Sequence, residues 1–170
     1  MCDDMLAAGV DGVIIQAITG LDGVSQTRQQ LQKALDRGLR IAGYVWCFGA
    51  TSVASRLSMF SGFLIEFLAI DVEDNSATIK AINRDLKLCD AYMGKLTEFY
   101  TGRWFFVGKG WLSRTQWSNR RLWDAIYDDD PNPDADFVPF AGWTECFMKQ
   151  FWDRQVYGGV ICDVNFRRAA

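Results

Sequence analysis

The chain alternates between short apolar runs and longer stretches with helical periodicity. Seven runs are candidate buried strands, and they span residues 11–18, 39–48, 67–73, 96–102, 121–127, 145–152 and 158–166. Between several of these runs, apolar residues recur every three or four positions, as an amphipathic helix requires. Alternation of strands and helices predicts a parallel sheet that is covered by helices.

Two folds fit such alternation, and the sequence of the loop after the first strand distinguishes between them. A doubly wound sheet usually carries a glycine-rich phosphate loop there, whereas this chain has TGLDGVSQ. A (β/α) barrel fits better, although eight units usually need about 250 residues. The chain has 170 residues without a linker or low-complexity segment. We therefore expect one α/β domain over residues 1–170, a small or incomplete (β/α) barrel of about seven strands.

Three helices can be placed from their apolar stripes and end signals. One spans residues 25–38 and ends at Gly38. Another is capped by Thr51, and its apolar positions are Val53, Leu57, Phe60 and Leu64. The clearest helix is capped by Asn75 or Ser76 and ends at Gly94. Its apolar positions are Ile79, Ile82, Leu86, Cys89 and Met93.

Composition excludes several classes of site. The chain has no histidine, so neither a Ser-His-Asp triad nor a zinc site with imidazole ligands is available. The five cysteines have no CxxC spacing, and we expect most of them to be reduced core residues. We expect no metal and no cofactor. Acid–base chemistry would therefore use carboxylates, Tyr, Lys or Cys.

Charge and hydropathy also limit the partners. Eighteen basic and 21 acidic residues give a net charge of −3, which argues against a nucleic-acid partner. No apolar run reaches the roughly 18 residues that cross a bilayer, and no N-terminal signal segment is visible. We expect no membrane partner, and export would need another route, such as a carrier particle or host lysis.

The run FLAIDVED, residues 67–74, places acids at the end of an apolar strand. Because side chains alternate along a strand, Asp71 and Glu73 share one face, with Cα atoms roughly 6–7 Å apart. In a barrel this face points inward at the carboxyl end of the strands, where barrel enzymes carry out their chemistry. One carboxyl can then have a raised pKa while the other stays ionised, which suits glycosidic bond cleavage. The simpler alternative is that Asp71 and Glu73 are solvated acids at a strand end, with no role in chemistry. Asp74, next to the expected helix cap, is given only a structural role.

The sequence resembles the muramidases of glycoside hydrolase family twenty-five, which include phage, bacterial and fungal lysozymes. The resemblance covers nearly the whole chain through six segments in order: AAGVDGVIIQAITG, ALDRGLRIAGYVW, LAIDVED, FYTG, LWDAIY and KQFWDRQVYGGVICDVNF. LAIDVED is similar to the family's Asp-x-Glu strand, and the last segment to its closing Gln-aromatic pair and Asp-x-Asn. The resemblance implies a peptidoglycan hydrolase of the endolysin kind, extracellular or phage-associated.

The resemblance also implies residue roles. Glu73 would be the general acid, Asp71 would orient the substrate or stabilise charge, and Asp163 would be a supporting acid of the last strand. Aromatic residues would line the groove and stack on sugar rings; these are Tyr44, Trp46, Tyr100, Trp123 and Tyr127. Trp46 and Trp123 could equally fill the core. We expect core positions for the other tryptophans, Trp104, Trp111, Trp117, Trp143 and Trp152.

Two features depart from the family pattern. The family normally opens with a strand that carries an Asp, whereas this chain opens with MCDDMLAAGV, which is similar to the family's first helix. Val45 stands where the family often has His. The strand at 11–18 should then have an open edge, which another chain or an N-terminal piece would fill. This favours two alternatives: a barrel that binds glycan without cutting it, and a structural component of a larger particle.

Overall fold

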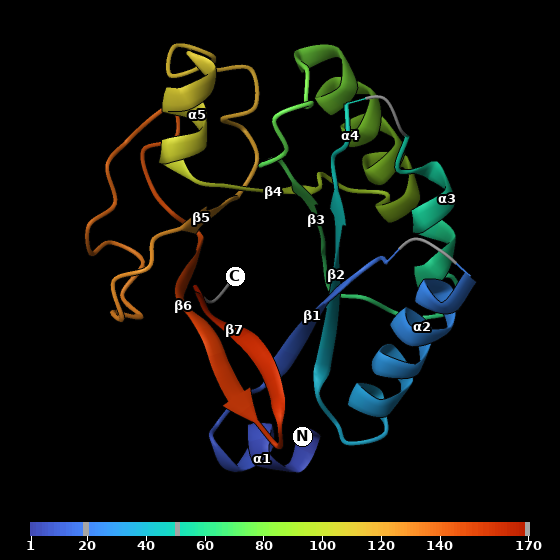
Figure 1. The fold of residues 1–170 in the computed structure, drawn as a ribbon. Coiled ribbons are helices and arrows are strands. Elements are labelled where there is room, and N and C mark those ends of the chain that lie inside the picture. Colours follow the sequence, from blue (N-terminus) through green and yellow to red (C-terminus); the bar gives the residue numbers. More distant parts are fainter. Residues whose placement is uncertain (19–20, 50–51, 169–170) are drawn as a thin grey trace. The chain divides into compact units, whose positions relative to one another are not determined.

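Seven strands form in the described residues, and each overlaps one of the expected apolar runs, although β6 extends five residues beyond its run (Figure 1). The computed structural model describes residues 1–18, 21–49 and 52–168. The strands are β1 Gly12–Gln16, β2 Arg40–Trp46, β3 Leu68–Asp71, β4 Glu98–Thr101, β5 Leu122–Ala125, β6 Met148–Tyr157 and β7 Val160–Arg167. The helices are α1 Cys2–Ala7, α2 Leu21–Leu35, α3 Ala54–Leu57, the 3-10 turn η1 Ser58–Phe60, α4 Ile79–Met93 and α5 Arg103–Lys109.

The chain divides into two compact units. The first comprises Met1–Thr97 with the turn residues Tyr157–Gly159, and the second comprises Glu98–Val156 with the segment from Val160 onwards. Strand order within each unit follows the sequence, β1-β2-β3 in the first and β4-β5-β6-β7 in the second. The expectation of a single domain over residues 1–170 stays a prediction.

The first unit contains a parallel sheet with helices on one side. β1 pairs with β2 and β2 with β3, both in parallel, and α2, α3 and α4 lie on the same side of these strands (Figure 1). Buried residues between them include Leu31 of α2, Val45 of β2 and Leu68 of β3. Within this unit β1 is an end strand, because β2 is its one strand partner among the described residues. This agrees with the expected open edge, and its occupation by another chain stays a prediction.

A glycine in β2 allows the layer of helices to approach closely. A Cβ added at Gly43 would lie 2.5 Å from ring atoms of Phe60 in η1. Phe60 is itself completely buried, so a shift of its ring would disturb the core residues around it. Only a residue without a side chain permits this approach of ring to backbone.

The helix expected around residues 53–64 is shorter than its apolar pattern indicated. α3 ends at Leu57 and η1 at Phe60, and Leu64 is 93% exposed. The prediction was wrong for Leu64. Gly62, two residues after the end of η1, has φ of +83°, a conformation that ends helical structure before Leu64 is reached. Thr51, the expected cap, lies outside the described residues.

Helix α4 matches its pattern except at the start. Gly94 ends it in the left-handed conformation, with φ of +66°. The cap is Thr78, whose side chain accepts a hydrogen bond of 3.1 Å from the backbone N–H of Ala81. The prediction of Asn75 or Ser76 was wrong, because both the backbone N–H and the hydroxyl of Ser76 bind the carboxylate of Asp74. Asp74 thus stabilises a local turn, which is the structural role expected for it.

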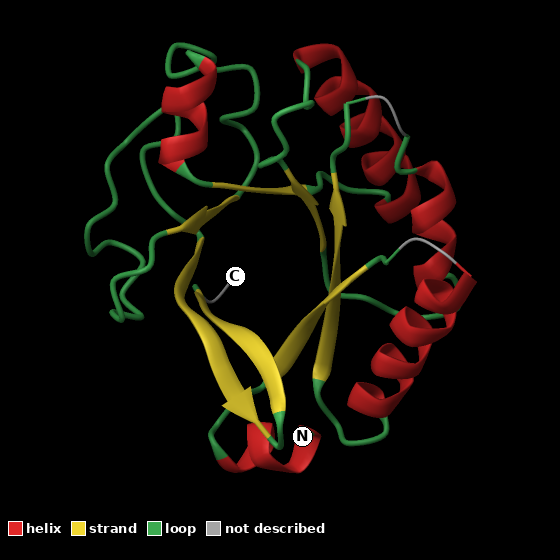
Figure 2. Cartoon of the chain, in the orientation of Figure 1, coloured by secondary structure: helices red, strands yellow, loops and turns green. Residues whose placement is uncertain are grey.

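The second unit combines a parallel sheet with a hairpin. β4 pairs with β5 and β5 with β6, both in parallel. β7 follows β6 after the two-residue turn Gly158–Gly159, so these neighbours run antiparallel. Both glycines have positive φ, as a tight hairpin turn requires. The expectation of a purely parallel sheet was therefore wrong at its last strand, and loops make up most of the remaining connections in this unit (Figure 2).

Aromatic rings form the core of the second unit. The ring of Phe99 lies 5.4 Å from that of Trp117 and 5.2 Å from that of Trp143. Both tryptophans are buried, which confirms the core positions expected for them. The same expectation was wrong for Trp104 and Trp152, which are 59% and 46% exposed. The remaining one, Trp111, is half-buried.

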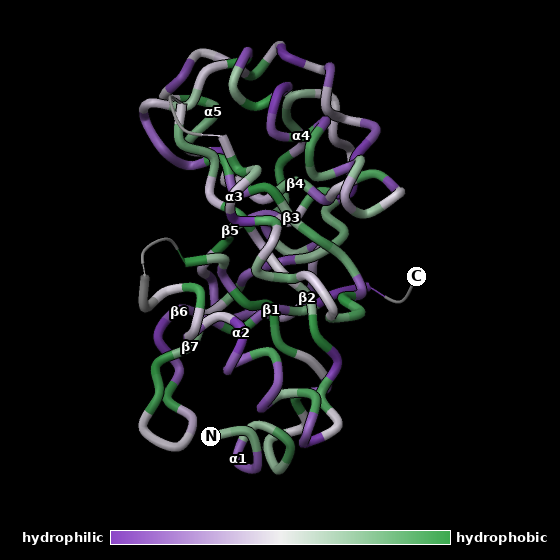
Figure 3. The backbone as a smooth tube through the Cα atoms, turned by 90° about the vertical axis from the view of Figure 1, so that its right-hand side faces the viewer, coloured by the Kyte–Doolittle hydropathy of each residue, from purple (hydrophilic) through white to green (hydrophobic). Residues whose placement is uncertain are grey.

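Hydrophobic residues follow much of the strands, and hydrophilic residues are frequent in the outer turns (Figure 3). In the described ranges, no helix combines the length and hydropathy needed to cross a bilayer. All five cysteines are free. Three of them are buried, Cys47, Cys89 and Cys146, as expected of reduced core residues. Burial raises the pKa of each of these three thiols to about 12.

Candidate active site

In the first unit, the expected site residues lie on the face of β2 and β3 that is turned away from the helices. Val45 of β2 belongs to the core beneath the helices, so its neighbours Tyr44 and Trp46 project from the opposite face. Trp46 is the register partner of Asp71, the last residue of β3. Register partners on adjacent strands project from the same face, so Tyr44, Trp46 and Asp71 lie together.

Asp71 is an acid buried at the carboxyl end of its strand. Its side chain is 6% exposed, and its Oδ1 atom is buried and accepts no hydrogen bond from any described residue. Burial raises the pKa of Asp71 well above the ordinary value of 3.8, and the nearby charges of Glu73 and Asp74 raise it further. Asp71 therefore favours its neutral form, in which a carboxyl group can donate a hydrogen bond as well as accept one.

Glu73 follows β3 by two residues and is half-buried. Its negative charge is the second cause of the raised pKa of Asp71, so the two carboxyl groups share one electrostatic environment. The sequence predicted such a pair and assigned the proton-donating role to Glu73. The pKa of Asp71 is raised in this way, and the acid role of Glu73 stays a prediction.

Trp46 brings a second buried polar group to this face. Its indole Nε1 is buried and has no hydrogen-bond partner among the described residues. Its ring stacks on Phe48, with centroids 5.6 Å apart and an angle of 18° between the planes. A donor on Trp46 and a carboxyl oxygen on Asp71 thus stand on adjacent strands, both unused. Buried polar groups of this kind are costly unless a ligand or water satisfies them.

The second unit gathers the other expected aromatic residues around a glutamine. Tyr100 and Trp123 are buried with ring centroids 4.5 Å apart, whereas Tyr127 is 55% exposed. The hydroxyls of Tyr100 and Tyr127 both donate to Oε1 of Gln150, at 2.5 and 3.0 Å. The sequence resemblance included Gln150 in its Gln-aromatic pair but gave it no role, although a glutamine within the apolar run MKQFW of β6 was a signal for a buried polar role.

Asp163 lies on β7 and is exposed. Its Oδ1 accepts a hydrogen bond of 3.4 Å from the backbone N–H of Arg154 on β6. The residue of this strand that reaches the aromatic cluster is Asn165, whose Oδ1 accepts a bond of 2.9 Å from the indole N–H of Trp123. The supporting role of Asp163 stays a prediction. Across the described ranges, Cys, Asp and Glu residues form no cluster that could hold a metal ion.

No protein-family model matches this sequence, and no curated protein matches it. Solved structures do match. A family GH25 lysozyme from Aspergillus fumigatus superposes with a TM-score of 0.78 at 16% identity, over 99% of this chain and 88% of that one. A muramidase from Trichobolus zukalii superposes with a TM-score of 0.74 at 18% identity, over 99% of this chain and 87% of that one. The catalytic domain of an endolysin from a bacteriophage of Listeria monocytogenes superposes with a TM-score of 0.68 at 14% identity, over 99% of this chain and 86% of that one.

These likenesses establish the fold. The chain has the fold of the family GH25 lysozymes, an incomplete (β/α) barrel for which the described residues supply seven strands. The fold class expected from the sequence is therefore confirmed, with the antiparallel β7 as its one correction. Because one fold can carry different functions, the function has to be argued from the chemistry of the site.

Proposed function

We propose that this chain is a peptidoglycan hydrolase, an N-acetylmuramidase of the lysozyme type that cleaves the glycan strands of the bacterial cell wall. The observation that carries the proposal is the pairing of Trp46 and Asp71 on adjacent strands, each with a buried polar atom that no described residue satisfies. The fold shared with muramidases supports the same reading.

An acetamido group fits these two polar atoms. The sugars of peptidoglycan carry such groups, and an amide has one acceptor oxygen and one N–H donor. The indole N–H of Trp46 would donate to the amide oxygen, and a carboxyl oxygen of Asp71 would accept from the amide N–H. An acetamido group held in this way can attack the adjacent anomeric carbon, so Asp71 would orient the group that replaces a protein nucleophile.

Glu73 is proposed as the general acid that protonates the leaving glycosidic oxygen. Its position two residues beyond Asp71 gives it a different exposure from the neighbouring carboxyl, which is how two acids at one site take different roles. Tyr44, Tyr100, Trp123 and Tyr127 are proposed to contact the sugar rings, and Asp163 to support the charge balance of the site.

The proposed partner is the peptidoglycan strand, and the proposed place of action is the cell wall, reached from outside or by release from a phage-infected host. No cofactor is needed, because two carboxyl groups and the substrate's own amide supply all of the acid, base and nucleophile functions.

The test is incubation of the purified chain with a cell-wall suspension. We expect turbidity to fall and new reducing ends of N-acetylmuramic acid to appear. A chain that sediments with the walls without producing reducing ends would instead be a glycan-binding barrel. A chain that neither binds nor cuts, and elutes as part of a large assembly, would support the structural role in a particle.

A further inference from the structure

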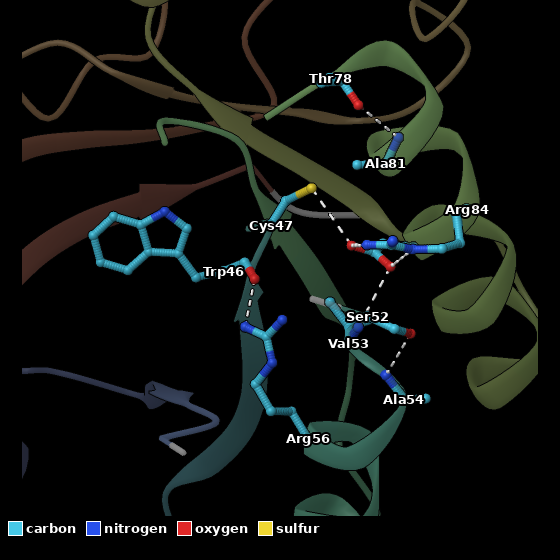
Figure 4. Close-up of polar contacts among 10 residues, drawn as sticks. Trp46, Cys47, Ser52, Val53, Ala54, Arg56, Thr78, Ala81 and Arg84 are labelled. Carbon is cyan, nitrogen blue, oxygen red and sulfur yellow. Dashed lines mark hydrogen bonds and ion pairs between the residues drawn. The ribbon is translucent and has the colours of Figure 1, made fainter. Parts of the chain in front are cut away.

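A buried arginine lies directly behind the aromatic pair of β2. Arg56 of α3 is 1% exposed, and its Nη1 donates a hydrogen bond to the backbone carbonyl of Trp46. Its guanidinium carbon also lies 5.3 Å from the ring centroid of Phe48, the ring on which Trp46 stacks. Figure 4 shows Arg56 reaching from α3 toward the Trp46 carbonyl. One guanidinium therefore contacts both members of the pair.

A buried carboxylate on α4 completes this arrangement. Asp85 is completely buried and accepts hydrogen bonds from the thiol of Cys47, at 3.5 Å, and from the backbone N–H of Val53, at 3.4 Å. Arg84 binds its two oxygens at 2.8 and 3.0 Å. Asp85 thus holds the chain on both sides of the segment that connects β2 to α3. Its charge also offsets part of the cost of burying Arg56.

Packing alone does not account for an arginine at this position. The Nε and Nη2 atoms of Arg56 are buried without hydrogen-bond partners among the described residues, and burial lowers the pKa of its guanidinium. An aliphatic side chain of similar length would fill the same space without these costs. What an aliphatic residue could not do is donate to the Trp46 carbonyl and hold the face of the Phe48 ring.

We propose that Arg56 is a positioning residue for glycan binding, which acts through Trp46 and does not touch the substrate. It fixes the Trp46–Phe48 pair as a rigid platform beside Asp71. This inference rests on the proposed function, because the platform is useful only if a sugar is bound there. Small displacements of a group that orients substrate weaken its action strongly, so the loss of Arg56 should appear in binding.

The first test is a double-mutant cycle with chitotetraose, the tetramer of N-acetylglucosamine, as the probe. Calorimetry would give its Kd for wild type, Arg56→Met, Trp46→Phe and the double variant. We expect Arg56→Met to weaken binding about tenfold, as the loss of a charge-assisted hydrogen bond implies. In the Trp46→Phe background the same change should have little further effect. Losses that multiply in the double variant would show that Arg56 acts independently of Trp46 and would overturn the proposal.

Arg28 offers a matched control within the same unit. Its Nη1 donates to the carbonyls of Met59 and Ser61, and its guanidinium lies 4.9 Å from the ring centroid of Phe63. These are the same two kinds of contact, made away from the candidate site. Arg28→Met should leave the Kd for chitotetraose within about twofold of wild type, a change small on the free-energy scale. An equal loss in both variants would assign Arg56 to general stability.

A second readout does not depend on sugar binding. In protein labelled with 5-fluorotryptophan, the resonance of Trp46 can be assigned as the one missing from Trp46→Phe. We expect Arg56→Met to shift or broaden that resonance selectively, and an unchanged Trp46 resonance would overturn the proposal. Should Arg56→Met not fold, Arg56→Lys keeps the charge but not the planar group, and the same shift is expected. If wild type binds no chitotetraose, the proposed function loses its support, while the fluorine spectrum still decides whether Arg56 positions Trp46.

Discussion

Trp46 and Asp71 are direct register partners on the parallel strands β2 and β3. The indole N–H of one and a carboxyl oxygen of the other are both buried without a partner among the described residues. In a folded core such groups are rare, because each costs free energy of about 1–3 kcal/mol. The two groups lie on adjacent strands at their carboxyl end, on the face away from the helices. A polar ligand bound there would gain hydrogen bonds from both.

Glu73→Gln should remove nearly all cell-wall hydrolysis while the fold stays intact. Glutamine keeps the shape and hydrogen bonding of the side chain but has no proton to give to the leaving oxygen. General acid catalysis is typically worth about 10²–10⁴-fold in rate. The measurement is the rate at which reducing ends appear, with circular dichroism to check folding. Equal rates for wild type and variant would remove Glu73 from the role of acid.

Asp74→Asn is the matched control for that change, because it removes a neighbouring carboxylate that stabilises a local turn. The side-chain oxygen of asparagine can still accept from the backbone N–H of Ser76, as Asp74 does at 2.7 Å. Hydrolysis should therefore stay close to that of wild type. A loss as large as that of Glu73→Gln would show that net negative charge, rather than one acid, is what the reaction needs.

Gly43→Ala should destabilise the first unit. The added Cβ would lie 2.5 Å from ring atoms of the buried Phe60, and inserting a methyl group into a well-packed core costs about 1–3 kcal/mol. Urea unfolding measures the change in the free energy of unfolding. Gly108→Ala is the control, because a Cβ there meets no atom within 4 Å. In helix α5 that substitution should be neutral or stabilise by about 0.5–1 kcal/mol.

Lys149→Met should loosen the polar loop of residues 128–136. Lys149 is completely buried, and its Nζ donates to the carboxylate of Asp128 at 2.5 Å and to the carbonyls of Asn132 and Ala135 at 3.2 and 3.1 Å. Removing the ammonium leaves these oxygens without their donor, at a cost of about 3–5 kcal/mol. We expect faster proteolysis within this loop. Lys87→Met, at an exposed position of α4, should not change the cleavage rate.

Much of the fold could be predicted because its signals are local. Every strand overlaps an apolar run, and α4 combines helical periodicity with a glycine at its end. The antiparallel β7 was missed although the sequence contains a hairpin signal, the Gly158–Gly159 pair, whose positive φ angles permit a two-residue turn. The strand assignments were correct there, and only the connection between the strands was misjudged.

The candidate site was less predictable, because burial and partners depend on tertiary contacts. The sequence identified Asp71 and Glu73 as a pair of acids, but the burial that raises the pKa of Asp71 comes from tertiary contacts, which the local sequence pattern does not contain. Gln150 gained its role only through two tyrosines from distant segments. The position of Arg56 was equally unpredictable, because nothing adjacent to it in sequence indicates that its guanidinium reaches the end of β2.

The burial of Asp71 predicts a characteristic dependence of stability on pH. Its pKa is raised in the folded state by burial and by the charges of Glu73 and Asp74, so the folded state holds this proton more tightly than the unfolded state. The contribution of Asp71 to stability is then fully present below the ordinary value of 3.8. It is lost as pH rises through the raised pKa of the folded state.

Asp71→Asn should remove this dependence, because asparagine is neutral at every pH. At neutral pH the variant should be more stable than wild type, because Asp71 must take up a proton or bury a charge on folding and asparagine does neither, and at pH 3 this pH-dependent difference should disappear. Urea unfolding at both pH values measures it, with the exposed Asp153→Asn as the control that should show no such change. The same Asp71→Asn protein should lose hydrolysis, since asparagine cannot release a proton and become the carboxylate that stabilises positive charge as the acetamido group attacks. A variant that is both less stable at neutral pH and fully active would show that Asp71 is held ionised by contacts in the fold and has no part in the chemistry.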